Sequence, residues 1–113
     1  MIFKITDKEG IKYSKESKDT NKIHTNNLYG YNSIYGEKIC HGCLVLIKFF
    51  KIKSFKKKIK KKEYSVDVTF FNYFKYNLKI YIKKKGKIYY LFQNQNLCAT
   101  VKIFHPSLSG PNL

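Results

Sequence analysis

The stretch that predicts most of the fold is YNLKIYIKKKGKIYYLF, residues 76–92. Apolar side chains occupy every second position up to Ile82, and Gly86 lies in a lysine-rich turn before a second apolar run, Ile88 to Phe92. Alternation with a period of two is typical of a strand with one buried face. A polar, glycine-containing turn between two such runs predicts a β-hairpin.

The same alternation continues on both sides of the hairpin. Residues 64–70 alternate before it, and residues 97–103 alternate after a polar turn at residues 93–96. The near-continuous apolar run from Cys43 to Phe50 is interpreted as a further strand, which leaves the core through residues 50–55. No stretch of useful length has a helical period. The sequence therefore predicts a mainly β fold, a small antiparallel barrel or sandwich of about five or six strands.

Two changes in composition divide the chain. Residues 1–34 are polar and basic, and they predict an extended N-terminal arm without a core of its own. Residues 35–104 contain the apolar and alternating runs and predict a β-barrel-like body. Residues 105–113 contain both prolines of the chain, which predict an irregular C-terminal tail.

The net charge is +16, from 23 basic and 7 acidic residues, and every basic residue is lysine. Such an excess favours a polyanionic partner, and lysine binds phosphate as a point charge rather than reading guanine as arginine does. An AT-rich coding sequence would also produce this much lysine, asparagine and tyrosine, so the charge alone does not decide the function. No uncharged apolar run approaches the roughly 20 residues of a membrane-spanning helix.

Candidate catalytic and metal-binding groups are few. Cys40 and Cys43 have the C-x-x-C spacing of a zinc or redox pair, but further ligands at a suitable spacing are missing. The alternative is two small residues beside a glycine turn. Cys98 and His105 lack a third group to orient them, and Asp67 is isolated. The three cysteines, an odd number, indicate a reducing compartment. We therefore expect no enzyme, no catalytic residue, no metal and no cofactor.

Four stretches, taken in order, resemble one family. Residues 14–21, SKESKDTN, resemble its Ser-x-Asn-Gly-Arg-Asp-Ser-Asn element, and residues 35–48, YGEKICHGCLVLIK, resemble its Tyr-Gly-Gly-Gln-x-Val-x-x-Gly-x-Ile-Ile-Val-Arg segment. Residues 66–71 and 78–86 resemble the strand and the basic turn that follow. The family is bacterial-type ribosomal large-subunit protein twenty-seven, found in bacteria, mitochondria and plastids. Its glycine-rich start and its Arg-Gln-Arg-Gly segment are absent here.

The resemblance implies a structural constituent of the large ribosomal subunit. Implied partners are large-subunit ribosomal RNA, neighbouring ribosomal proteins and, near the N-terminal arm, the acceptor end of tRNA, with no membrane. The implied location is the mitochondrion, with a plastid or the bacterial cytoplasm as alternatives. The lysines that we expect to contact RNA phosphates are Lys12, Lys15, Lys18, Lys22, Lys48, Lys51, Lys53, Lys56, Lys57, Lys58, Lys60, Lys61, Lys62, Lys83, Lys84, Lys85 and Lys87.

Two other functions stay open at the level of sequence. A free-standing barrel would bind single-stranded nucleic acid by stacking bases on exposed aromatic rings, for which Phe49, Phe50 and Tyr73 are the candidates. A zinc-stabilised adaptor would use Cys40 and Cys43.

Overall fold

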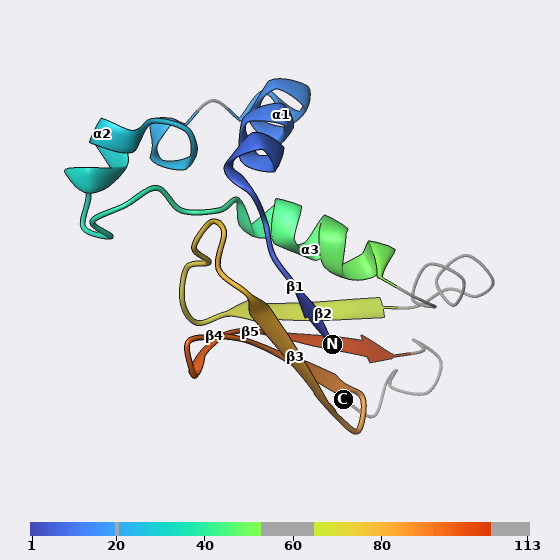
Figure 1. Cartoon of the computed structure of the whole chain (residues 1–113). Coiled ribbons are helices and arrows are strands. Elements are labelled where there is room, and N and C mark those ends of the chain that lie inside the picture. Colours follow the sequence, from blue (N-terminus) through green and yellow to red (C-terminus); the bar gives the residue numbers. More distant parts are fainter. Residues whose placement is uncertain (20, 53–64, 105–113) are drawn as a thin grey trace.

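The computed structural model describes residues 1–19, 21–52 and 65–104, and Figure 1 shows their arrangement. In chain order the elements are β1 (Ile2–Phe3), α1 (Asp7–Ser17), the 3-10 helix η1 (Lys22–His24), α2 (Asn27–Tyr31), α3 (Gly42–Lys51), β2 (Ser65–Phe70), β3 (Ile80–Lys85), β4 (Ile88–Gln93) and β5 (Asn96–Phe104). Among these residues, no helix has both the length and the apolar character that crossing a membrane requires.

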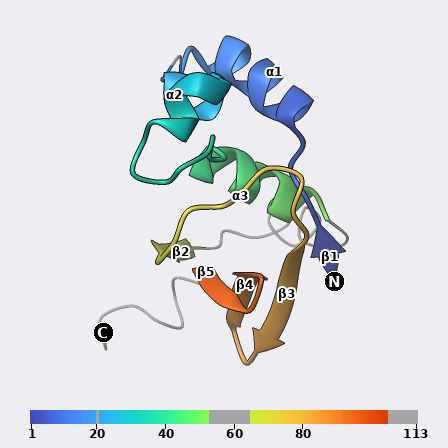
Figure 2. The same ribbon diagram turned by 60° about the vertical axis from the view of Figure 1, so that its left-hand side comes forward.

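The described strands form one antiparallel sheet in the order β1-β3-β4-β5-β2. The β3–β4 hairpin pairs Tyr81 with Phe92 and Lys85 with Ile88. Gly86 lies in its turn with φ 62°, a left-handed conformation that glycine adopts without steric cost. The predicted hairpin and the mainly β, antiparallel class are confirmed. The predicted barrel or sandwich is wrong, because the described strands form a single sheet with helices over one face (Figure 2).

Helix α3 lies across one face of the sheet (Figure 1), where the sequence predicted a strand. Leu44, Val45 and Phe49 are its buried residues, and the four-residue step from Val45 to Phe49 places both on one side of a helix. A helix against a sheet can be apolar over much of its length, and periodicity cannot separate such a short run from a buried strand. The predicted strand from Cys43 to Phe50 is therefore wrong.

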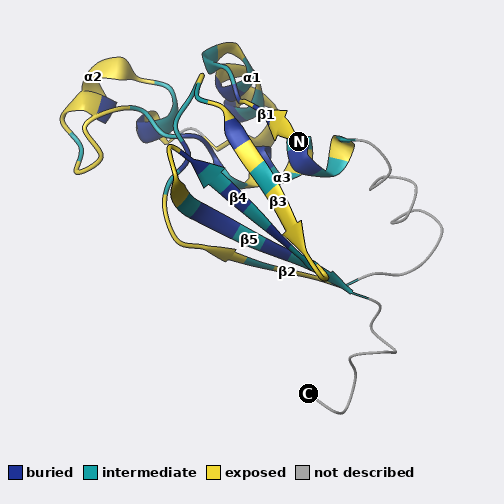
Figure 3. Cartoon of the chain, turned by 60° about the horizontal axis from the view of Figure 1, so that its bottom comes forward, coloured by how far each residue is buried: buried dark blue, intermediate teal, exposed yellow. Residues whose placement is uncertain are grey.

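The core lies between α3 and the sheet. Tyr89 and Leu91 are buried residues of β4, and the Phe49 ring contacts the Tyr89 ring edge-on with centroids 5.5 Å apart. Because neighbouring strand residues point to opposite faces, Tyr90 and Phe92 lie on the other face. Figure 3 shows this alternation of burial along the strands, and no described helix covers the second face.

The N-terminal segment is helical rather than extended. Thr6 and Glu9 form a capping box at the start of α1: the Thr6 hydroxyl accepts from the Glu9 N–H at 3.3 Å, and the Glu9 carboxylate accepts from the Thr6 N–H at 2.9 Å. The buried residues of α1 are Gly10 and Ser14, which are small, so no apolar period marks the helix in the sequence. The predicted extended arm is wrong for the described residues. The division at residues 34 and 104 stays a prediction, and the tail at 105–113 lies outside the described residues.

The capping box has a measurable consequence. Thr6→Ala should lower the free energy of unfolding by about 1 kcal/mol, because the Glu9 N–H loses its acceptor. Urea unfolding measures this difference. Thr6→Ser keeps the hydroxyl and should retain most of the stability. Equal losses in both variants would contradict a capping role.

Candidate active site

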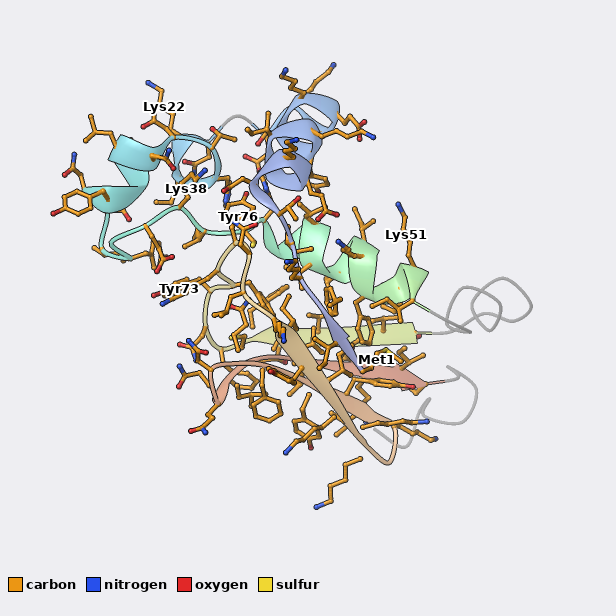
Figure 4. The ribbon with its side chains drawn as sticks, in the orientation of Figure 1. Met1, Lys22, Lys38, Lys51, Tyr73 and Tyr76 are labelled. Carbon is orange, nitrogen blue, oxygen red and sulfur yellow. The ribbon has the colours of Figure 1, made fainter. Side chains whose placement is uncertain are left out.

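Three titratable side chains from separate parts of the helical layer meet beside the start of α3. Asp19 follows the end of α1, His24 ends η1, and His41 is the N-cap residue of α3. Their ligand atoms all lie within 4.8 Å of one another. Figure 4 shows Tyr76 rising from the loop before β3 towards the same helices. We call Asp19, His24 and His41 the histidine cluster.

The His24 imidazole is held so that one nitrogen is free. Its Nδ1 lies 2.8 Å from the carbonyl oxygen of Ile39, and since a carbonyl can only accept, Nδ1 carries the hydrogen. In the neutral ring, Nε2 then has a lone pair that can accept a proton. The backbone is fixed as well, because the Tyr76 hydroxyl donates to the His24 carbonyl at 2.9 Å and the Ile39 N–H donates to the Ile23 carbonyl at 3.1 Å.

His41 is buried in contact with the other two members. Its ring stacks on the His24 ring with centroids 3.8 Å apart, and its Nε2 lies 3.1 Å from Ser14 Oγ and 3.7 Å from Asp19 Oδ2. Burial lowers the pKa of His41 below 6.5, the neighbouring His24 lowers this pKa further, and Asp19 acts in the opposite sense. His41 is therefore neutral at pH 7. A hydrogen on its Nε2 faces Ser14 and the Asp19 carboxylate.

Asp19 lies at the exposed end of the histidine cluster. The chain turns there because Lys18 ends α1 in a left-handed conformation, with φ 63°. Asp19 Oδ1 accepts from the Asn21 N–H at 3.3 Å, while Oδ2 faces His41. A half-exposed carboxylate beside two imidazoles can orient a water molecule or exchange a proton with it.

His24 opens onto a cleft of about 560 Å³. Phe70 and Phe74 line its apolar wall, and Gly42, the first residue of α3, also lies in it. His41 makes no side-chain cap, so the first N–H groups of α3 and their partial positive charge can receive an anionic oxygen there. A Cβ at Gly42 would lie 3.0 Å from the Phe70 ring. The cleft therefore combines a proton acceptor, an uncapped helix N-terminus and an apolar wall.

The buried, neutral His41 makes the stability of the fold depend on pH. The unfolded chain binds a proton at His41 below pH 6.5, whereas the folded pKa is lower, so stability falls as the pH falls through 6.5. Urea unfolding between about pH 7 and about pH 5 should show this loss, and His41→Gln should flatten it. The further loss of stability at more acidic pH should persist in that variant. It has a separate cause, because the hydrogen bond from Lys38 lowers the pKa of Asp7 below 3.8. An unchanged slope in His41→Gln would contradict the assignment.

The distances within the histidine cluster alone would also allow a metal ion. His24 Nδ1, however, is hydrogen-bonded to the Ile39 carbonyl, and His41 Nε2 is hydrogen-bonded to the Ser14 hydroxyl, so two of the candidate ligand nitrogens already have partners. The geometry therefore favours proton transfer. Cys40 and Cys43, the pair of the zinc hypothesis, are not part of the cluster. Burial raises the pKa of Cys40 to about 12, so its thiol is protonated at pH 7.

Of the lysines predicted to contact RNA, none of the described members lines the cleft. The described members are Lys12, Lys15 and Lys18 on or after α1, Lys22 in η1, Lys48 and Lys51 in α3, and Lys83, Lys84, Lys85 and Lys87 on the hairpin. The members outside the described residues are Lys53, Lys56, Lys57, Lys58, Lys60, Lys61 and Lys62. Lys48 is already paired with Glu9 at 2.8 Å. No observation tests whether the others contact an anion.

Sequence reasoning misses the histidine cluster as a group. Its members are brought together by the packing of α1, η1 and α3, and no spacing rule connects them. The usable signal is His41, because a histidine directly before an apolar run can lie at a helix N-terminus if that run is helical. Interpreting the run as a strand removes this signal.

Comparison with known proteins shows which fold this is. No family model and no curated protein matches the sequence. The (R)-hydratase of A. caviae matches with a TM-score of 0.68 and 14% identity, over 94% of this chain and 92% of its own. R-hydratase PhaJ1 of Pseudomonas aeruginosa matches with a TM-score of 0.59 and 16% identity, over 94% of this chain and 77% of its own. HtdX of Mycobacterium tuberculosis matches with a TM-score of 0.69 and 17% identity, over 91% of this chain and 46% of its own. At these identities the likeness shows the fold, which is hotdog-like.

These likenesses overturn the ribosomal interpretation. Two of the matching structures are named (R)-hydratases and share this fold rather than a ribosomal one, so the resemblance to ribosomal protein twenty-seven is wrong, and with it the structural role in the large subunit. Ribosomal RNA, neighbouring ribosomal proteins and tRNA have no support as partners, and the free-standing nucleic-acid-binding barrel has none either. Residues 35–48 show why the resemblance misleads. They were expected to begin a barrel, but from Gly42 onward they form the start of α3.

The expectation that the protein is not an enzyme also loses its support, since the (R)-hydratases of this fold are enzymes. A mitochondrial location stays a prediction.

Proposed function

We propose that the protein is a hydratase, which adds water reversibly to a carbon–carbon double bond conjugated to a carbonyl group. The observation that carries this proposal is His24. Its Nδ1 hydrogen is committed to Ile39, so its Nε2 can take a proton in a cleft that also contains the start of α3. Two of the solved structures with this fold are named (R)-hydratases, which supports the same reaction class.

The reaction needs a base and a place for negative charge. As the water oxygen bonds to the β-carbon, His24 Nε2 takes one water proton, and the electrons of the double bond move onto the carbonyl oxygen as an enolate. The backbone N–H groups at Gly42 and the α3 N-terminus hold that oxygen. The proton on His24 then passes to the α-carbon, which restores the carbonyl group and frees the base.

Asp19 and His41 support His24 in different ways. The Asp19 carboxylate orients the attacking water and offsets the charge of the protonated His24 ring. His41 is a positioning residue: it stacks on His24, and its Nε2 lies between Ser14 and Asp19. Since His41 stays neutral, it adds no second positive charge beside the base.

The cleft wall favours an apolar substituent on the substrate. Tyr35, Phe70, Phe71 and Phe74 line it, and the Tyr35 ring packs against the Tyr73 ring with centroids 4.8 Å apart. No lysine is among the described residues that line the cleft. We therefore expect short, apolar α,β-unsaturated carbonyl compounds to be better substrates than charged ones.

A direct assay tests the proposal. The purified protein is incubated with a panel of α,β-unsaturated esters and thioesters, and hydration is followed as the loss of ultraviolet absorbance of the conjugated system. Mass spectrometry in ¹⁸O-labelled water confirms that the new hydroxyl comes from solvent. Asp19→Asn keeps the shape of the side chain and should reduce the rate by at least about tenfold.

Glu16→Gln is the matched control, because it removes an exposed carboxylate of α1 that pairs with Lys12 at 3.9 Å and lies outside the histidine cluster. It should hydrate at the wild-type rate. Absence of label in the product across the whole panel, or equal rates in both variants, would sink the proposal.

A further inference from the structure

The face of the sheet opposite α3 has no helix over it in the described structure (Figures 2 and 3). Two cross-strand pairs lie at its centre, Tyr81 opposite Phe92 and Lys83 opposite Tyr90. Strand alternation places Lys85 and Lys102 on the same face, where Lys102 lies opposite Ile88. We call Tyr81, Lys83, Lys85, Tyr90, Phe92 and Lys102 the outer face.

A hollow of about 610 Å³ opens on the outer face. Tyr81, Lys83 and Phe92 line one side, and Asn94 and Gln95 of the β4–β5 turn line the other. Both turn residues have positive φ, 47° and 66°. The lining combines two aromatic rings with a lysine and two amide side chains, and the volume is large enough for more than one side chain of a partner.

The charges of the described residues are divided between the two sides of the sheet. Five carboxylates belong to the helical layer and its loops, and each is within 4.0 Å of a basic group: Asp7, Glu9, Glu16, Asp19 and Glu37. The described strands contribute one acidic residue, Asp67, which lies opposite Lys102 on the same face and offsets the charge of that one lysine. No described carboxylate pairs with Lys83 or Lys85, and the Lys83 ammonium rests over the Phe92 ring at 5.8 Å. The outer face is therefore strongly positive around an aromatic centre.

We propose that the outer face docks an acidic protein surface, with carboxylates on Lys83 and Lys85 and apolar side chains in the hollow. An aromatic centre within a charged rim is the usual anatomy of a protein interface. A single strand of nucleic acid would need several free ring faces for base stacking, but the Lys83 ammonium lies over the Phe92 ring and Tyr90 is only partly exposed, which leaves Tyr81 as the exposed ring of the outer face. A bilayer favours projecting apolar side chains over a hollow. This surface lies across the sheet from the histidine cluster, so the proposal does not depend on the hydratase activity.

The probe for this surface is a fluorescein-labelled helical peptide with glutamates along one face and leucines along the other. Binding to the full-length protein is measured by anisotropy at physiological ionic strength. The double variant Lys83→Glu, Lys85→Glu should weaken binding by at least about tenfold. Tyr81→Ala should weaken it by a similar factor, because the hollow loses a wall.

The matched control is Lys8→Glu, Lys51→Glu, which makes the same change of net charge on two exposed helical lysines. It should weaken binding by less than about twofold, since salt screens charges beyond about 10 Å. Melting curves establish that each variant is folded, and Lys83→Gln, Lys85→Gln replaces the reversal if the latter unfolds.

Three results would overturn the proposal. The two double variants could weaken binding equally, which would mean that only net charge matters. A peptide with glutamine in place of glutamate could bind as tightly, which would mean apolar adhesion. An oligothymidylate or a phosphatidylserine vesicle could bind more tightly than the peptide through the same lysines, which would assign the face to nucleic acid or lipid.

Discussion

Replacing His24 with glutamine should reduce the rate of hydration by a factor of about 10² to 10⁴, the usual contribution of a general base. Glutamine is close to histidine in length and places a neutral amide near the position of Nε2, so the local packing changes little although the Nδ1 donor to Ile39 is lost. Glutamine has no group that accepts a proton at neutral pH. The loss should appear in kcat, measured with the best substrate of the panel, while KM changes little.

The control for this variant is Lys22→Gln, an exposed residue of the same 3-10 helix. It should keep the wild-type rate. Circular dichroism and melting curves should show that His24→Gln is folded. If His24→Gln retained full activity, the base would have to be another group, and the proposal that rests on the Nε2 lone pair would fail.

The sheet could be predicted from sequence because its strands follow local rules. In β4 the side chains alternate between faces, and the turn before it contains a glycine at the position with positive φ. The bounds of β4 follow from the same pattern, since Ile88 directly follows the lysine turn and Gln93 begins the next polar turn. Where one residue's environment depends on its near neighbours, the sequence suffices.

The helical layer could not be predicted, because its contacts depend on what lies across from it. Helix α1 buries Gly10 and Ser14 rather than large apolar residues. A Cβ on Gly10 would collide with the Tyr76 ring, so the glycine is there for a close approach that only the folded structure makes visible. Ser14 is buried because its hydroxyl contacts His41, far along the chain. Polarity alone indicates an extended arm in such a segment.

The site shares this limitation. Asp19, His24 and His41 become one group only when α1, η1 and α3 have packed, and the uncapped helix N-terminus exists only if residues 42–51 are helical. The large positive charge points instead to a polyanion. In the structure the described lysines are distributed over both layers, and none of them lines the candidate site. Composition therefore describes the surface of this protein and says little about its cleft.

The structure of residues 42–51 also makes the largest prediction for stability. Phe49→Ala should lower the free energy of unfolding by about 3–5 kcal/mol, because the ring is completely buried and its removal leaves a cavity beneath α3. The ring contacts that would be lost include the Phe50 edge, with centroids 5.2 Å apart. Denaturant unfolding measures the change.

Ile47→Ala is the informative control, because it separates a helix from a strand. Ile47 is 42% exposed on α3, so its truncation should cost less than about 1 kcal/mol. In a strand, residues 47 and 49 would lie on the same face and their side chains would be buried or exposed together. In the helix the two side chains are separated by about 200° of rotation, since each residue advances about 100°. Similar losses in the two variants would therefore contradict α3 itself, and with it the helix N-terminus on which the proposed enolate site depends.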